Sequence, residues 1–103
     1  PDRNKVFQVA TRVLIDNAAS RTHSVVEING RDRPGLLYDV TAALTELGLQ
    51  ISSAHIATYG EHVVDSFYVK DVFGLKIEHE DKLRQIRRRL LEAVERDPDQ
   101  KAA

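Results

Sequence analysis

The order of strand-type and helix-type periodicity constrains this chain more than any other feature. Apolar residues recur at a helical period over residues 36–47 and 81–94, and β-branched residues gather over 22–28, 50–58 and 62–70. The sequence therefore predicts the order β-α-β-β-α. This order is most of a ferredoxin-like α+β sandwich, in which two helices cover one face of a four-stranded antiparallel sheet.

The fourth strand of such a sheet has to come from the N-terminal side. The fold needs one more strand beside its first one, and the polar residues after Val94 cannot supply it. Residues 6–15 are rich in β-branched side chains, and we predict a strand around residues 13–15 that forms a short hairpin with 22–28. The predicted order is thus ββαββα, with the usual last strand supplied from the N-terminus.

The length and charge of the chain set its general class. We assign residues 13–97 to one domain, 1–12 to an N-terminal extension and 98–103 to a polar tail. With 15 Lys and Arg against 16 Asp and Glu, the formal net charge is −1, which favours neither nucleic acid nor an anionic membrane as a partner. There is no cysteine, and we expect a cytoplasmic protein. There is also no methionine, even at position 1, so we expect a piece of a longer protein.

Residues 29–35, Asn-Gly-Arg-Asp-Arg-Pro-Gly, join the predicted second strand to the first helix. The N–H groups at a helix start lack intrahelical partners and favour an anion such as an α-carboxylate. Pro34 stiffens the loop, and Gly35 lets a ligand approach the backbone. Asp32 is placed to accept from an α-ammonium group, and Gln50, at the start of the next strand, to pair with a side-chain amide. The alternative is a loop that only turns the chain, with Asp32 capping the helix.

Other kinds of site find little support in the sequence. The four histidines, His23, His55, His62 and His79, do not have the spacing of a zinc site, and we predict no metal. No Gly-x-Ser-x-Gly elbow or acylphosphatase-type Asn is present, so we predict no catalytic residue. The arginines at 87–89 are most simply a solvated helix face near the C-terminal end that the helix dipole favours, and a docking patch for an acidic partner is the alternative.

Two segments carry a resemblance to a known family. Residues 30–37, GRDRPGLL, resemble the Pro-Gly loop of ACT domains, and residues 48–56, GLQISSAHI, resemble the entry into their second strand. A longer pattern over 13–91, including DNAASRT at 16–22 and VDSFYV at 64–69, is similar to the last ACT domain of the bifunctional uridylyltransferase/uridylyl-removing enzymes.

This resemblance implies a regulatory domain that senses an amino acid, with glutamine as the expected ligand. In ACT domains that bind amino acids, a polar residue two before the proline and an amide at the start of the second strand often contact the ligand; Asp32 and Gln50 hold these positions. Serine-binding members carry a histidine where this chain has Gly30, and Asn29 is the expected substitute. The full expected ligand-binding set is Asn29, Gly30, Asp32, Arg33, Pro34, Gly35, Leu36 and Gln50.

The resemblance also implies a larger parent protein. Its nucleotidyltransferase and HD phosphohydrolase domains, which use Mg²⁺, would lie upstream, and its substrate would be the PII signal protein. For this fragment we expect no enzymatic activity and no cofactor. Such domains pair through sheet or helix edges, so we expect a homodimer or pairing with a second ACT domain. The alternative function is a structural dimerisation or PII-docking module that binds no ligand.

Overall fold

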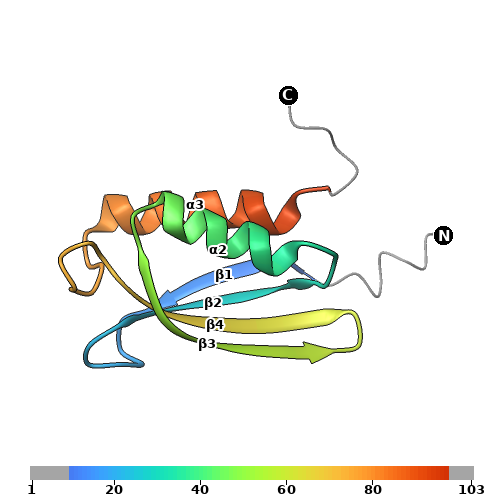
Figure 1. Cartoon of the computed structure of the whole chain (residues 1–103), viewed down its shortest axis with the longest axis horizontal. Helices are drawn as coiled ribbons and strands as arrows, with labels where there is room; N and C mark the ends of the chain where they lie inside the picture. Colours follow the sequence, from blue (N-terminus) through green and yellow to red (C-terminus); the bar gives the residue numbers. More distant parts are fainter. Residues whose placement is uncertain (1–9, 98–103) are drawn as a thin grey trace.

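Residues 10–97 fold into a four-stranded antiparallel sheet with two helices on one face (Figure 1). The computed structural model describes residues 10–97, and the predicted extension and tail fall largely outside this range. The strands lie in the order β1-β2-β4-β3. Their bounds are Arg12–Asp16 for β1, Ser24–Arg31 for β2, Gln50–Tyr59 for β3 and His62–Lys70 for β4, and the helices are α2 at Leu36–Glu46 and α3 at Glu80–Glu95. The predicted ferredoxin-like sandwich is confirmed.

Strand β1 fills the position that the sequence left open. It pairs antiparallel with β2, with Val13 opposite Ile28 and Ile15 opposite Val26, so the strand from the N-terminal side takes one edge of the sheet. Because alternate residues of a strand point to opposite faces, Val13 and Ile15 both face the helices. Helix α3 packs over β1 and β2 and holds this edge in place.

Strand β2 is longer than the sequence predicted. We expected residues 29–31 in the loop, but the strand continues through Asn29 and Gly30 to Arg31, and Gly30 pairs with Val63 of β4. A Cβ at position 30 would lie 2.8 Å from Cγ1 of Val94, so a larger residue would force the Val94 side chain on α3 to shift. Gly30 therefore lies inside β2, where it packs against α3, and not in a turn.

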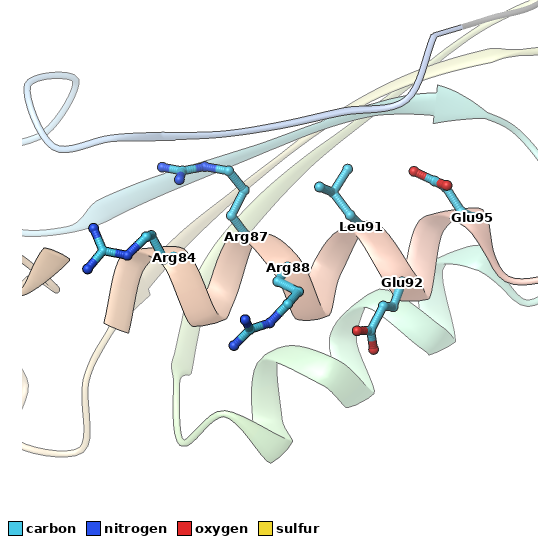
Figure 2. Close-up of a pocket in the computed structure, with 6 residues that line it drawn as sticks. All are labelled: Arg84, Arg87, Arg88, Leu91, Glu92 and Glu95. Carbon is cyan, nitrogen blue, oxygen red and sulfur yellow. The ribbon is translucent and has the colours of Figure 1, made fainter. Parts of the chain in front are cut away.

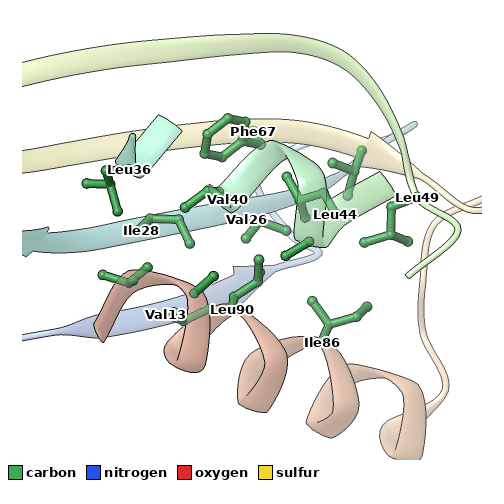
Figure 3. Close-up of a cluster of buried hydrophobic side chains, with 14 of the residues drawn as sticks. Val13, Val26, Ile28, Leu36, Val40, Leu44, Leu49, Phe67, Ile86 and Leu90 are labelled. Carbon is green, nitrogen blue, oxygen red and sulfur yellow. The ribbon is translucent and has the colours of Figure 1, made fainter. Parts of the chain in front are cut away.

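The core lies between the sheet and the two helices (Figure 3). Phe67 is its largest fully buried side chain. The other large members come from every layer: Val26 and Ile28 from β2, Val69 from β4, Val40 and Leu44 from α2, and Ile86 and Leu90 from α3. Leu37, which we placed on the apolar stripe of α2, is exposed instead.

A buried hydroxyl ties the loop after β1 to the segment before α3. Ser24, fully buried at the start of β2, accepts a hydrogen bond of 2.9 Å from the Ile77 N–H and donates to Oδ1 of Asn17. Nδ2 of Asn17 in turn donates to the Ile77 carbonyl at 2.8 Å. These bonds hold the two segments together at the end of the sandwich opposite the start of α2.

Candidate functional site

The segment from Asp32 to Gly35 forms an exposed turn at the start of α2. The Asp32 N–H donates to the Glu61 carbonyl at 2.7 Å, which fastens the loop to the β3–β4 turn. Gly35 is the N-cap residue with φ of 79°, a left-handed conformation that favours glycine. No side chain of the described residues caps the helix, so Asp32 does not have the capping role that the alternative gave it. A loop that only turns the chain stays the alternative to a binding loop. The Leu36 N–H donates to the Arg33 carbonyl at 3.2 Å, so the capacity to bind an anion lies with the N–H groups that follow it in the first turn.

The Arg33 side chain joins the loop to α3, and its Nη1 atom also donates to the Pro34 carbonyl at 3.2 Å. The Nη2 atom donates to the Ala93 carbonyl at 2.6 Å and lies 2.9 Å from Oδ2 of Asp39, whose other oxygen is 3.1 Å from Nη1 of Arg96. The Arg33 and Asp39 side chains are only 12% and 14% exposed. We expected Arg33 in the ligand-binding set; its guanidinium joins the loop and α2 to the last turn of α3.

A carboxylate lies behind the loop, on the helix-facing side of β4. Asp65 is only 5% exposed, and one of its oxygens accepts a hydrogen bond of 3.3 Å from the Ala57 N–H. Burial raises the pKa of Asp65 above its ordinary value, the negative charge of Asp32 raises it further, and the Ala57 N–H opposes both. Asp32 and Asp65 thus lie close enough for their charges to interact, and Asp32 is three residues before the N-cap of α2. Together these features suit a zwitterion that carries both an ammonium and a carboxylate.

The ligand-binding set predicted from the sequence did not include Asp65. The sequence pattern could have pointed to it, because Asp65 is the one carboxylate on the apolar face of β4, which it shares with Val63, Phe67 and Val69. A charged residue in the middle of a buried strand face costs folding free energy unless its charge is paired. Such a residue is therefore a candidate for a functional role.

Gln50 is not beside Asp32 within one chain. It begins β3 opposite Lys70, and its Nε2 atom donates to the Asp71 carbonyl at 2.8 Å. The loop lies at the other end of β3, where Tyr59 pairs with His62. A ten-residue strand spans about 30 Å. Asp32 and Gln50 therefore do not share one pocket within a single chain, because α2 spans the sheet between the loop and the start of β3.

The remaining predicted residues divide between the loop and the core. Pro34 and Gly35 are exposed in the loop, whereas Leu36 is buried beneath the helix. Gly30 faces Val94 inside the sandwich. Asn29 lies on the opposite face of the sheet, where its Nδ2 atom donates to Glu27 at 3.0 Å, so it does not reach the loop opening.

Strand β3 is an open edge of the sheet. Among the described strands only β4 pairs with it, and nearly all of its residues are exposed on both faces. Ile56, on the helix-facing side opposite Asp65, is 50% exposed. An edge strand of this length with apolar side chains is a template for pairing with another strand.

The described residues contain no other chemistry of note. Within residues 10–97 no three His, Asp or Glu side chains gather as metal ligands would. His55 faces Ser66 across β3 and β4, and Nε2 of His23 forms a hydrogen bond of 2.9 Å with the Ser52 hydroxyl. No helix in residues 10–97 is long and apolar enough to cross a bilayer.

The fold and this loop define an ACT-like sandwich, and comparison with known proteins agrees. The model of the ACR9-like, ACT-like domain family matches residues 12–97, and the chain belongs to this family. A crystal structure of an unknown protein from Galdieria sulphuraria shares the fold, with a TM-score of 0.51 and 23% identity over 73% of this chain and 38% of that one.

Closer relatives identify the kind of protein that carries such a domain. The chain is 71% identical over 92 residues to the bifunctional uridylyltransferase/uridylyl-removing enzyme of Azospirillum brasilense, and 63% identical over 94 residues to that of Rhodospirillum rubrum. These matches cover 89% and 91% of this chain. They span only 10% of each relative, so this ACT-like domain corresponds to a small part of those enzymes.

Proposed function

We propose that this domain senses an amino acid, glutamine, for a uridylyltransferase/uridylyl-removing enzyme in the cytoplasm. The observation that carries the proposal is the start of α2, which no described side chain caps, with Asp32 in the adjoining loop and Asp65 near enough to interact with the Asp32 charge. The helix N–H groups would bind the α-carboxylate, and Asp32 would accept from the α-ammonium group. A metabolite sensor needs an affinity near 1 mM, about −4 kcal/mol, which a few such contacts supply.

The ligand's side-chain amide needs a third contact, and a second ACT domain can provide it. If two β3 edges pair antiparallel about a two-fold axis, Gln50 of one copy lies beside Tyr59 of the other. Tyr59 is at the end of β3 to which the Asp32 loop is fastened. The Gln50 side chain already donates to Asp71, which leaves its carbonyl oxygen to accept from the amide of glutamine. The site would then form between two domains.

Binding at this interface would favour one packing of ACT domains over another. A ligand can shift such an equilibrium only through its different affinity for the two arrangements. Because the site would need both copies, glutamine would stabilise the paired state, and the pairing would bias the action of distant catalytic domains on the PII signal protein.

A thermal-shift titration tests the sensing role. At 10 mM ligand and a dissociation constant near 1 mM, glutamine should add about 1.4 kcal/mol to stability, which raises the melting temperature by about 5–10 °C. Serine lacks the amide and glutamate replaces it with a charge, so both should shift it less. Asp32→Asn should remove the response, and Asp81→Asn, on exposed α3, should keep it. No shift with any of the three amino acids would contradict sensing and favour a purely structural module.

A further inference from the structure

Three cationic side chains line one surface pocket at the end of the sandwich opposite the start of α2. Arg21, Lys70 and Lys76 border this pocket, which has a volume of about 420 Å³. They come from the loop between β1 and β2, the last residue of β4 and the segment before α3. These three segments meet at the left of Figure 1, whereas the β3–β4 turn lies at the right. We call this site the basic pocket.

Hydrogen bonds within the fold fix the backbone that carries these cations. The Lys76 ammonium group donates to the Asn17 carbonyl at 2.6 Å. Arg21 belongs to a turn in which the Ser20 hydroxyl accepts from two backbone N–H groups, at 3.2 and 3.1 Å. Lys70 is half-buried at the end of β4. A pocket that is already ordered in this way loses less entropy when a ligand binds.

The positive charge of the basic pocket has no partner in the fold. Within residues 10–97, none of the three cations forms an ion pair. Glu78 also borders the pocket, and it forms no ion pair in the same part of the chain. Three cations and one carboxylate give the pocket a formal charge of +2, in a chain whose net charge is −1. A hollow lined by one sign of charge focuses the potential, so an anion is attracted there.

The arginines of α3 do not form a comparable site. Figure 2 shows that Arg84, Arg87 and Arg88 share the outer surface of this helix with Glu92 and Glu95. Opposite charges therefore nearly balance on this surface, and Arg84 already has an ion-pair partner one turn away. The last turn of α3 contains no basic residue, so the expectation that the arginines gain from the helix dipole is wrong.

We propose that the basic pocket binds a small ligand through a di- or triphosphate group. Guanidinium groups bind phosphate oxygens in pairs, and lysine ammonium groups act on them as point charges. A carboxylate carries one charge, so it gains less from three cations than linked phosphates do. Nucleic acid binding would require several phosphate contacts along a broad basic surface, which one pocket of this volume does not provide. Leu75, 62% exposed at the wall of the pocket, adds an apolar surface beside the phosphates.

This inference does not depend on the proposed amino-acid site. The Asp32 loop is fastened to the turn where β4 begins, and Lys70 is the residue where β4 ends. A strand of nine residues spans about 30 Å. Binding at one site can therefore be measured while the other is left unchanged.

An NMR titration of the whole ¹⁵N-labelled chain at constant ionic strength tests the pocket. Inorganic pyrophosphate and ATP should both shift the amide signals of residues 21, 70 and 74–76, with a dissociation constant of about 1 mM. Adenosine, which has no phosphate, should leave these signals in place. Equal constants for pyrophosphate and ATP would identify the phosphates as the whole ligand, and tighter binding of ATP would add a contact with Leu75.

Charge variants separate this pocket from general attraction to a cation. Arg21→Gln and Lys70→Gln should each weaken pyrophosphate binding about fivefold, because each removes one exposed charge that faces the anion. Arg88→Gln is the matched control: it removes the same charge from exposed α3 and should change the constant by less than about twofold. Glu78→Gln should tighten binding by about twofold to fivefold, because it removes a like charge from the pocket wall.

The tighter binding of Glu78→Gln cannot arise from a loss of folding, so this variant keeps the test decisive if the others are unstable. The proposal would be overturned by the absence of a saturating shift at these residues up to about 10 mM pyrophosphate, tenfold above the expected constant. It would equally be overturned if Arg88→Gln weakened binding as much as Lys70→Gln, or if Glu78→Gln left the constant unchanged.

Discussion

Arg33 should stabilise the domain strongly. Replacing it with alanine removes the 2.6 Å bond to the Ala93 carbonyl and the 2.9 Å ion pair with Asp39, in surroundings that are largely buried. Hydrogen bonds to charged groups contribute about 1.5–3 kcal/mol each. Asp39 keeps Arg96 as a partner, which limits the loss. We therefore expect Arg33→Ala to cost about 2–3 kcal/mol, or about 10–20 °C in melting temperature for a domain of this size.

Urea denaturation followed by circular dichroism measures this effect. Arg96→Ala is the matched control, because Arg96 binds the same carboxylate from a half-exposed position and should cost only about 0.5 kcal/mol. Arg33→Lys should fall between the two, since one ammonium cannot reproduce the fixed geometry of the guanidinium. An Arg33→Ala loss no larger than that of Arg96→Ala would show that Arg33 is not held between the helices. Its side chain would then be available to a ligand, as the sequence suggested.

Three further predictions concern buried positions. Ser24→Ala should cost about 1–3 kcal/mol in urea denaturation, because it leaves buried polar partners unpaired, while Ser53→Ala on exposed β3 should change little. Gly30→Ala should lower the free energy of unfolding by about 1–3 kcal/mol through its clash with Val94. Adding Val94→Ala to the same chain should recover part of that loss, and no recovery would mean that the strain lies elsewhere. The raised pKa of Asp65 means that its contribution to stability is greatest below pH 3.8 and is lost as pH rises through the folded pKa. The gain in the free energy of unfolding that Asp65→Asn gives over the native chain should therefore grow from pH 4 to pH 7. A gain independent of pH would contradict the argument that burial raises the pKa.

Periodicity in the sequence was enough to predict the sheet, both helices and the use of β1 as the missing strand. Local patterns were less reliable where tertiary contacts decide the outcome. Asn29 and Gly30 looked like loop residues, and only the close passage of Val94 explains a glycine inside β2. Arg33 looked available to a ligand, because its bond to Ala93 joins residues 60 positions apart.

In the candidate site too, features set by local sequence could be predicted, and features set by tertiary contacts could not. The loop from Asp32 to Gly35 could be predicted, because its chemistry is local to the start of a helix. The position of Gln50 relative to the loop could not, since it depends on which end of β3 faces which end of α2. The exposed edge of β3 is likewise visible only once the strand order is known.

A subunit-mixing experiment tests most directly whether the amino-acid site is shared between two copies. Asp32→Ala and Gln50→Ala chains should each fail to bind glutamine in isothermal titration calorimetry. After equal mixing with subunit exchange, half of the dimers would hold one chain of each kind and regain one complete site, so about a quarter of the native binding capacity should return. A mixture that binds no more glutamine than either variant alone would contradict a site shared between two copies.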